Sequence, residues 1–331
     1  KDFDADTGQL KQPEKFALLP KSEAETLAAT LLTTKPWTVN SVTETPYQTH
    51  PYPPFITSTL QREGARKLGW GAKHTMRVAQ SLYEQGYITY MRTDSVILSE
   101  QALIAAREAA REFGAEYVSP VPKQYASKAK LAQEAHEAIR PAGDSFRHPN
   151  EVAREVDADE AKLYDLIWKR TVASQMKSAE MMRLSVIVAV DSAEFEAKGK
   201  RILFAGYLRA YVEGSDEPEA ELEDQEIALP ALRQGQAVDP ISVEAQGHDT
   251  QPPARYTEAS LIKKLEAEGV GRPSTYATIL DTIMAREYVT KLGSALVPTF
   301  TAMIVDEYLQ HYFSSLVEVG FTAKMEEDLD H

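Results

Sequence analysis

The sequence contains no cysteine in its 331 residues. This absence excludes disulfide bonds and zinc sites that are built on thiolates. The sequence also lacks a signal peptide and any apolar run long enough to cross a bilayer, so we expect a cytoplasmic protein. The length is more than one hydrophobic core usually holds, which predicts two or three domains.

Positive charge is also scarce, because 36 Lys and Arg face 50 Asp and Glu and leave a net charge of −14. Such a balance argues at first against a polyanionic partner. The charge is uneven, however: residues 50–149 hold 13 basic against 10 acidic residues, a net of +3, which leaves −17 for the remainder. Phosphate binding needs only local positive charge, so the composition permits a nucleic-acid partner without indicating one.

The stretch GYITYMRTDS, residues 86–95, carries the strongest sign of chemistry. Its β-branched and aromatic residues after a glycine predict a short strand over residues 87–91. Alternation along that strand would place four side chains on one face: Ile88, Tyr90, Arg92 and Asp94. A phenol is a poor nucleophile until a nearby cation favours the phenolate, so a tyrosine beside an arginine suits phosphoryl transfer. The alternative is a half-buried tyrosine beside a surface ion pair.

Two segments have the pattern of helix pairs. Helices over about 58–68 and 73–85, separated by a glycine turn and followed by the strand, predict a helix-turn-helix unit. A helix between Thr257 and Gly269, a second with Pro273 in its first turn, and a hairpin turning near Gly293 predict a winged helix.

Other elements are predicted from caps and periodicity. Ser99 should cap a third helix, and Asp157 with Glu160 should form the capping box of a long amphipathic helix. Period-two patterns over residues 183–212 predict three antiparallel strands. A helical turn should place His136 and Arg140 on one face.

The stretch at 86–95, together with PPFITSTLQREGARKLGWGAKHTMRVAQSLYEQ before it, resembles the active-site region of bacterial type IA DNA topoisomerases. Two further segments are similar to the same family and follow in the same order: EAHEAIRP at 134–141, and PPARYTEASLIKKLEAEGVGRPSTYATIL at 252–280. Three long motifs in the order of the family argue against a chance resemblance.

The resemblance implies a multidomain α+β fold, part of a toroid with CAP-like helix-turn-helix or winged-helix domains and a β-rich arch. The arch would comprise residues 1–47 and 177–248, the tyrosine domain 48–176, and part of the single-stranded-DNA-binding base 249–331. The family's TOPRIM domain, which holds Mg²⁺ and a general acid, has no counterpart in this sequence. We therefore expect a fragment that binds no metal by itself.

The resemblance also implies a function, the ATP-independent relaxation of negatively supercoiled DNA. Tyr90 would attack one strand and hold its 5′ phosphate while another strand passes, with Arg92 as its catalytic partner. Expected DNA-binding residues are Gln80, Glu84, Thr89, Asp94, His136, Arg140, Arg255, Arg272, Ser274 and Thr275. The implied partners are single-stranded and negatively supercoiled DNA, with no membrane, and the protein would be a nucleoid-associated monomer. The fragment alone should bind single strands without cleaving them.

Alternatives remain at the level of the residues. The chain could be a non-catalytic module in which Tyr90 only stacks on bases. The helix start at Arg272, Ser274 and Thr275 favours a phosphate but could be plain capping. Rolling-circle nickases and tyrosine recombinases also use tyrosine on DNA, but their His-x-His pair and their spaced arginines with histidine are both absent here.

Overall fold

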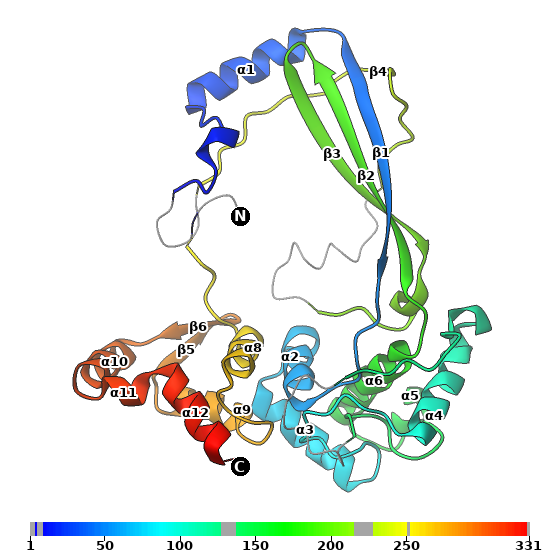
Figure 1. Ribbon diagram of the computed structural model, residues 1–331, viewed down its shortest axis with the longest axis vertical. Coiled ribbons are helices and arrows are strands. Elements are labelled where there is room, and N and C mark those ends of the chain that lie inside the picture. Colours follow the sequence, from blue (N-terminus) through cyan, green and yellow to red (C-terminus); the bar gives the residue numbers. More distant parts are fainter. Residues whose placement is uncertain (1–3, 5–8, 127–136, 215–227, 250–251, 330–331) are drawn as a thin grey trace. The chain divides into compact units, whose positions relative to one another are not determined.

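The computed structural model describes residues 4, 9–126, 137–214, 228–249 and 252–329. The chain has a mixed α+β fold and divides into two compact units (Figure 1). The first unit comprises residues 1–48, 180–203 and 225–254, and the second comprises 49–179, 204–224 and 255–331. Among the described residues, no helix combines the length and the apolar character needed to span a bilayer.

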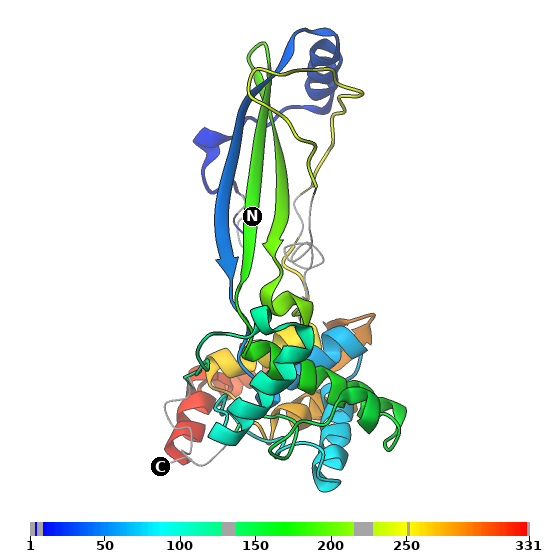
Figure 2. The same ribbon diagram turned by 90° about the vertical axis from the view of Figure 1, so that its right-hand side faces the viewer.

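The first unit is built on an antiparallel sheet with the strand order β3-β2-β1-β4. Its elements are the 3-10 turn η1 (Pro13–Lys15), α1 (Lys21–Thr33), β1 (Trp37–Thr49), β2 (Ala179–Val190), β3 (Ala193–Phe204) and β4 (Ala237–Val238). The three long strands lie side by side in Figures 1 and 2. Leu31, Trp37 and Val190 form a small core under α1, and the Trp37 ring lies 4.9 Å from that of Phe195.

Two of the three strands predicted over 183–212 are present, but the third is wrong. The chain after β3 forms the 3-10 turn η4 (Gly206–Arg209). Gly206 has φ +52, and a side chain there would place its Cβ 2.4 Å from the carbonyl oxygen of Ser178. Tyr207 and Tyr211, four residues apart, are both buried, so this stretch has helical rather than alternating burial.

The first part of the second unit is helical. It contains α2 (Thr57–Leu68), α3 (Ala72–Glu84), α4 (Glu100–Ala110), the 3-10 turns η2 (Arg111–Phe113) and η3 (Ala115–Tyr117), α5 (Pro149–Val152) and α6 (Ala158–Ser174). The predicted caps are confirmed: the Ser99 hydroxyl accepts from Ala102 N, and Asp157 and Glu160 form the capping box of α6. One face of α6, which includes Leu163, Ile167 and Thr171, is fully buried.

The second part of this unit follows the predicted helix, helix, hairpin order. It contains α8 (Glu258–Glu268), α9 (Tyr276–Ala285), β5 (Val289–Leu292), β6 (Ala295–Pro298), α10 (Phe300–Tyr312), α11 (Ser314–Val317) and α12 (Val319–Leu329). Thr257 caps α8, and Gly269 ends it with φ +74, as predicted. Pro273 is not in the first turn of α9 but in a separate turn before it, because Arg272 N donates to Thr275 Oγ1 at 2.8 Å.

The helices of the two parts contact each other through polar and apolar groups. Ser58 on α2 donates to Glu266 on α8 at 2.8 Å, and the buried Glu258 accepts from Ala72 N at the start of α3, also at 2.8 Å. Ala72 also packs in one core with Ile262 and Leu280.

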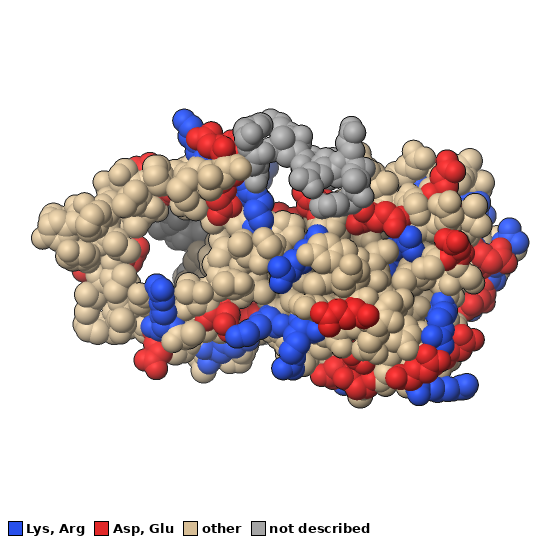
Figure 3. Space-filling model, turned by 90° about the horizontal axis from the view of Figure 1, so that it is seen from below, with Lys and Arg blue, Asp and Glu red and all other residues tan. Residues whose placement is uncertain are grey.

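Figure 3 shows acidic and basic side chains mixed on one face of the molecule, with few charges on the left, where α10 lies. The exposed side chains of α10 include Phe300, Met303, Ile304, Tyr308 and Tyr312.

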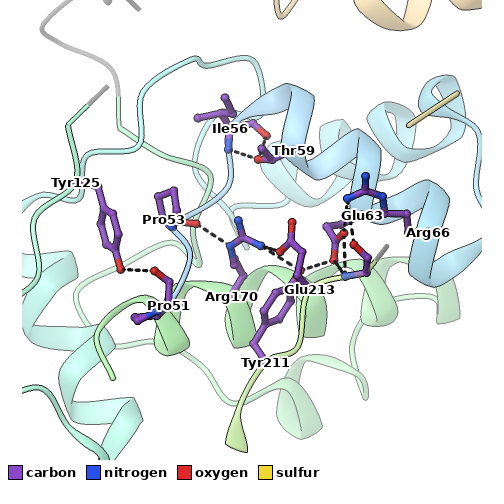
Figure 4. A network of polar contacts seen from close by, with 11 residues as sticks. Pro51, Pro53, Ile56, Thr59, Glu63, Arg66, Tyr125, Arg170, Tyr211 and Glu213 are labelled. Carbon is purple, nitrogen blue, oxygen red and sulfur yellow. Dashed lines mark hydrogen bonds and ion pairs between the residues drawn. The ribbon is translucent and has the colours of Figure 1, made fainter. Parts of the chain in front are cut away.

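A buried ionic network joins α2, α6 and residues 211–214 (Figure 4). Arg170 on α6 is 2% exposed; its Nε donates to Pro53 O at 2.7 Å, and its guanidinium pairs with Glu213. The Tyr211 hydroxyl donates to Glu63 on α2, which also accepts from Gly214 N at 3.1 Å. Burial raises the pKa of Glu213, and the positive charge of Arg170 opposes that rise. The network fixes the returning chain against two helices.

Candidate active site

The stretch that carries Tyr90 begins where α3 ends. Gly86 has φ +79, and the helix ends there in a Schellman motif. Its two hydrogen bonds run from Gly86 N to Tyr83 O at 2.9 Å and from Tyr87 N to Leu82 O at 2.8 Å. A residue with a Cβ adopts this left-handed conformation at a cost, so glycine suits the position. The turn sends the chain directly from α3 into residues 87–95.

The predicted strand over residues 87–91 is wrong. Ile88 makes a single β-bridge with Pro141, and the bonds around it are Thr89 N to Arg140 O at 2.9 Å and Ala142 N to Tyr87 O at 2.8 Å. Proline has no N–H, so the ladder loses a donor at this position. The segment is nevertheless held, because the Thr89 hydroxyl donates to Ala138 O at 2.7 Å.

On the other side of Tyr90 the chain is held by Thr57, the first residue of α2. The Thr57 hydroxyl donates to Met91 O at 2.8 Å and accepts from Thr93 N at 2.9 Å. Thr57 N also donates to Thr93 O at 3.0 Å. Because Thr57 is completely buried, water does not compete for these hydrogen bonds. Tyr90 thus lies between two backbone segments that are each fixed by hydrogen bonds.

The side chains alternate from Tyr90 onward. Tyr90 is 47% exposed and Arg92 is exposed, whereas Met91 and Thr93 are buried. Ile88 is buried as well, so the prediction that it shares the face of Tyr90 is wrong. The Tyr90 ring packs edge-on against Tyr83 with 5.2 Å between centroids. Within the described part of the chain, no hydrogen bond or ion pair engages the Tyr90 hydroxyl or the Arg92 guanidinium.

Beside this stretch a cavity of about 440 Å³ lies between α3 and α9. It gathers four of the residues that the sequence singled out: Gln80, Glu84, Arg92 and Ser274. Gln80 Nε2 donates to Glu84 Oε1 at 2.8 Å along α3, which orients both side chains. The cavity therefore has an arginine without an acidic partner, an amide and a hydroxyl on its walls.

The remaining predicted residues lie at three kinds of place. Thr89 is half-buried, and its hydroxyl donates to the backbone carbonyl of Ala138. Ser274 and Thr275 are exposed in the turn before α9, where Thr275 Oγ1 accepts from Arg272 N. Arg255 is exposed just before α8 and does not line the cavity. His136 lies outside the described residues, so its predicted place beside Arg140 has no structural counterpart here.

Arg140 lies in a different setting from the one predicted. Residues 137–141 are extended rather than helical, since Ile139 N donates to Phe55 O at 2.8 Å. Arg140 is 8% exposed, and its guanidinium donates to Pro141 O at 2.8 Å and to Glu137 at 2.7 Å. These bonds engage both terminal nitrogens of the guanidinium, so the structure gives Arg140 the role of fixing the backbone that Thr89 contacts.

Arg272 and Asp94 lie near the start of α9. Arg272 is half-buried and donates to Gly271 O and to Glu326, both at 2.9 Å. Burial is the main cause that raises the pKa of Tyr276 to about 12. The negative charges of Glu266, Glu326 and Asp94 raise this pKa further, and the positive charge of Arg272 lowers it. The Asp94 carboxylate thus lies within electrostatic reach of the first residue of α9.

A second tyrosine anchors the same stretch. The Tyr87 hydroxyl donates to Glu155 at 2.8 Å, and Arg147 donates to both oxygens of Glu155, at 2.9 and 2.6 Å. The bonds from Arg147 and then from Tyr87 lower the pKa of Glu155 to about 2. The carboxylate is therefore charged at neutral pH and ties Tyr87 to the chain ahead of α6.

Sequence reasoning missed two basic residues of the cavity wall, Lys73 and Arg77. With Gln80 and Glu84 they occupy positions 73, 77, 80 and 84, which is the spacing of one helix face. That polar stripe was a signal that could have found them. The role of Thr57 had no such signal, because its partners lie 34 and 36 residues away.

The described residues do not fit a magnesium site. Among them, no group of three or more His, Asp and Glu side chains could hold a metal ion. The Glu84 carboxylate already has a partner, since it accepts from Gln80 Nε2. Mg²⁺ prefers several oxygen ligands in octahedral geometry, and the described residues do not provide such a set.

Comparisons with known proteins identify the family of this chain. The family described as DNA topoisomerase matches residues 2–331, nearly the whole chain. The chain belongs to the bacterial type IA DNA topoisomerases. It is 56% identical to DNA topoisomerase 1 of Synechocystis sp. over 330 residues, covering 99% of this chain and 36% of that protein. It is 52% identical to DNA topoisomerase 1 of Streptomyces coelicolor over 336 residues, covering 100% of this chain and 35% of that one.

A solved structure of this family has the same fold. The chain matches full-length topoisomerase I from Thermotoga maritima with a TM-score of 0.77 and 33% sequence identity. The match covers 99% of this chain and 53% of that one. The chain thus spans just over a third of the length of the curated type IA topoisomerases that it matches.

Proposed function

We propose that this chain supplies the nucleophile and part of the DNA-binding surface of a type IA topoisomerase that relaxes negatively supercoiled DNA without ATP. One observation carries the proposal: Tyr90 is exposed between two fixed backbone segments, and Arg92, from the same stretch, lines a cavity. A nucleophile has to be accessible and held at the same time, and this arrangement supports both.

In the proposed reaction the Tyr90 phenolate oxygen attacks a phosphorus atom of a single DNA strand. The new bond joins Tyr90 to the 5′ phosphate, the bond from phosphorus to the 3′ oxygen breaks, and the phenol proton is lost to solvent. The Arg92 guanidinium stabilises the negative charge that develops on the phosphate oxygens. After strand passage the 3′ hydroxyl attacks the phosphotyrosine, reforming the strand and releasing Tyr90.

The 3′ oxygen leaves poorly unless it receives a proton and a nearby cation balances its charge. We assign the proton donor and the magnesium to parts of the longer protein beyond this chain, because the described residues provide no metal site. For the isolated chain we therefore propose binding of single-stranded DNA through Gln80, Ser274 and the turn at Arg272–Thr275, without cleavage. Arg255 and His136 remain proposed contacts.

Tyr90→Phe in a full-length protein tests the nucleophile. The variant should fold and bind single strands like the parent, because one exposed hydroxyl is removed, but it should neither form a covalent adduct nor relax DNA. Tyr83→Phe is the matched control, since its ring packs against that of Tyr90 at 5.2 Å and it should retain activity. Relaxation by a clean Tyr90→Phe preparation would exclude Tyr90 as the nucleophile.

A second candidate function for the isolated chain is that of a non-catalytic single-strand-binding module, in which the exposed Tyr90 ring stacks on a base. A denaturing gel separates the two readings. The chain is incubated with a labelled oligonucleotide and magnesium, with and without the remainder of the protein. An adduct that forms only with the remainder supports the topoisomerase assignment, and none in either case supports the binding module.

A further inference from the structure

The cavity beside Arg92 continues into a second one of about 330 Å³ between the same two helices. The two share four lining residues, namely Lys73, Arg77, Ala277 and Asp281. They form one groove along α3 and α9, here called the α3–α9 groove, with Glu84 near one end and His74 near the other. At a helical rise of about 1.5 Å per residue, the stretch of α3 that lines the groove is on the order of 15 Å long. This length exceeds the spacing of about 3.4 Å between successive nucleotides of one strand.

Arg77 lies in the shared part of this groove and is held by a histidine. Its Nη2 lies 2.7 Å from His74 Nδ1, and His74 Nε2 lies 2.9 Å from Asp159 Oδ2. A guanidinium can only donate, so Nδ1 accepts and the ring proton is on Nε2, where it is donated to Asp159. The Trp70 ring packs edge-on against His74 at 4.8 Å. The imidazole is therefore fixed in position and tautomer, and it orients Arg77 without neutralising its charge.

Two other basic residues of the groove are paired with carboxylates. Lys73 bonds to Asp281 at 2.8 Å, and Lys291 pairs with the buried Glu258. Arg77 makes no ion pair with a carboxylate anywhere in the described chain, and the same is true of Arg92. An exposed arginine that is simply solvated does not need a histidine to hold its guanidinium in place. An arginine that a neutral histidine holds over a groove is suited to grip an anion with its remaining donors.

We propose that Arg77 binds a backbone phosphate of single-stranded DNA that lies in the α3–α9 groove, and that His74 and Asp159 position Arg77 for that contact. The proposal rests on the proposed function and extends it by a second phosphate contact, in addition to the one at Tyr90 and Arg92. The groove then guides the strand along α3 and contributes to the affinity for single strands.

The test measures binding of the whole chain to a fluorescent single-stranded oligothymidylate over a series of salt concentrations. Each phosphate contact in a single strand contributes about 0.7 to the slope of log affinity against log salt. Arg77→Gln should lower the slope by about that amount and weaken binding on the order of tenfold at low salt. Arg77→Lys should keep the slope and lose only part of the affinity, because it retains the charge without the fork.

Arg111→Gln is the matched control, since Arg111 is also exposed but pairs with Glu108 at 3.4 Å and lies outside the groove. Its slope should equal that of the parent. A positioning role for His74 is tested by His74→Phe, which keeps a ring against Trp70. The substitution should weaken binding when Arg77 is present and add little to Arg77→Gln, because both act through one contact.

Four results would overturn the proposal or one of its two parts. An unchanged slope in Arg77→Gln, or an equal fall in Arg111→Gln, removes the phosphate contact while leaving the proposed function intact. Additive effects of His74→Phe and Arg77→Gln remove the positioning role. A parent chain that does not bind the oligonucleotide overturns both this contact and the single-strand binding on which it rests.

Discussion

The bonds from Thr57 to the backbone around Arg92 are the clearest link between packing and the proposed chemistry. The Thr57 hydroxyl serves Met91 O and Thr93 N, at 2.8 and 2.9 Å, in a site without solvent access. Valine has nearly the same shape but no hydroxyl, so Thr57→Val leaves the buried Thr93 N–H without this acceptor and Met91 O without this donor. An orphaned buried donor costs about 1–3 kcal/mol and a lost hydrogen bond about 1 kcal/mol, so we expect a loss of about 2–4 kcal/mol in the free energy of unfolding.

Thr75→Val provides the matched control. Thr75 is equally buried, but its hydroxyl donates to Gly71 O at 3.2 Å, and this carbonyl also accepts from Thr75 N at 3.0 Å. Because that carbonyl keeps a partner, we expect a loss under about 1 kcal/mol. Urea unfolding monitored by circular dichroism measures both variants against the parent.

The same pair separates stability from positioning. In the full-length protein, at a temperature where every variant is folded, Thr57→Val should slow covalent adduct formation by about tenfold or more, because small displacements of reacting groups are costly. Thr75→Val should cleave at the parental rate. If Thr57→Val proves as stable as Thr75→Val and cleaves like the parent, residues 91–93 do not depend on Thr57 and the reasoning is refuted.

Two further predictions concern charged groups near the same stretch. Arg92→Lys should slow cleavage less than Arg92→Ala, because lysine keeps the charge but loses the bidentate fork; equal rates in the parent and both variants would contradict a role on the phosphate. Glu155 has a folded pKa lowered to about 2 by Arg147 and Tyr87, so its contribution to stability is present above its usual pKa and is lost as pH falls toward about 2. In urea unfolding between about pH 5 and 2, Glu155→Gln should therefore be less stable than the parent at the upper end and converge with it at the lower end, and a constant difference would show that the ion pair does not titrate as described.

Local signals in the sequence were sufficient for most helices and for the hairpin. Ser99, Asp157 and Thr257 each have the side chain that bonds to backbone N–H groups a few residues later, so these helix starts were predictable. Gly269 and Gly293 have positive φ and mark a helix end and a turn that other residues adopt at a cost. Motif order was likewise enough to indicate the family, which the match over residues 2–331 confirms.

Tertiary contacts decided what the local pattern could not. Residues 87–91 have strand composition, but their partner segment contains Pro141 and continues no ladder, so they form a fixed loop instead. The pattern of residues 205–212 suggested a strand, yet Gly206 lies against the Ser178 carbonyl and Tyr211 is drawn into the network of Glu63 and Arg170.

The same division holds for the candidate site. The sequence by itself determined which residues could react, since Tyr90 and Arg92 are two positions apart in any extended chain. It did not determine that Arg140 would be buried among carbonyl groups, nor that Arg77 would share a groove with α9, because α3 and α9 lie about two hundred residues apart in sequence. Periodicity assigns a side chain to a face of its own element, whereas the partner of that face is set by packing between distant segments, and only the tertiary structure contains that information.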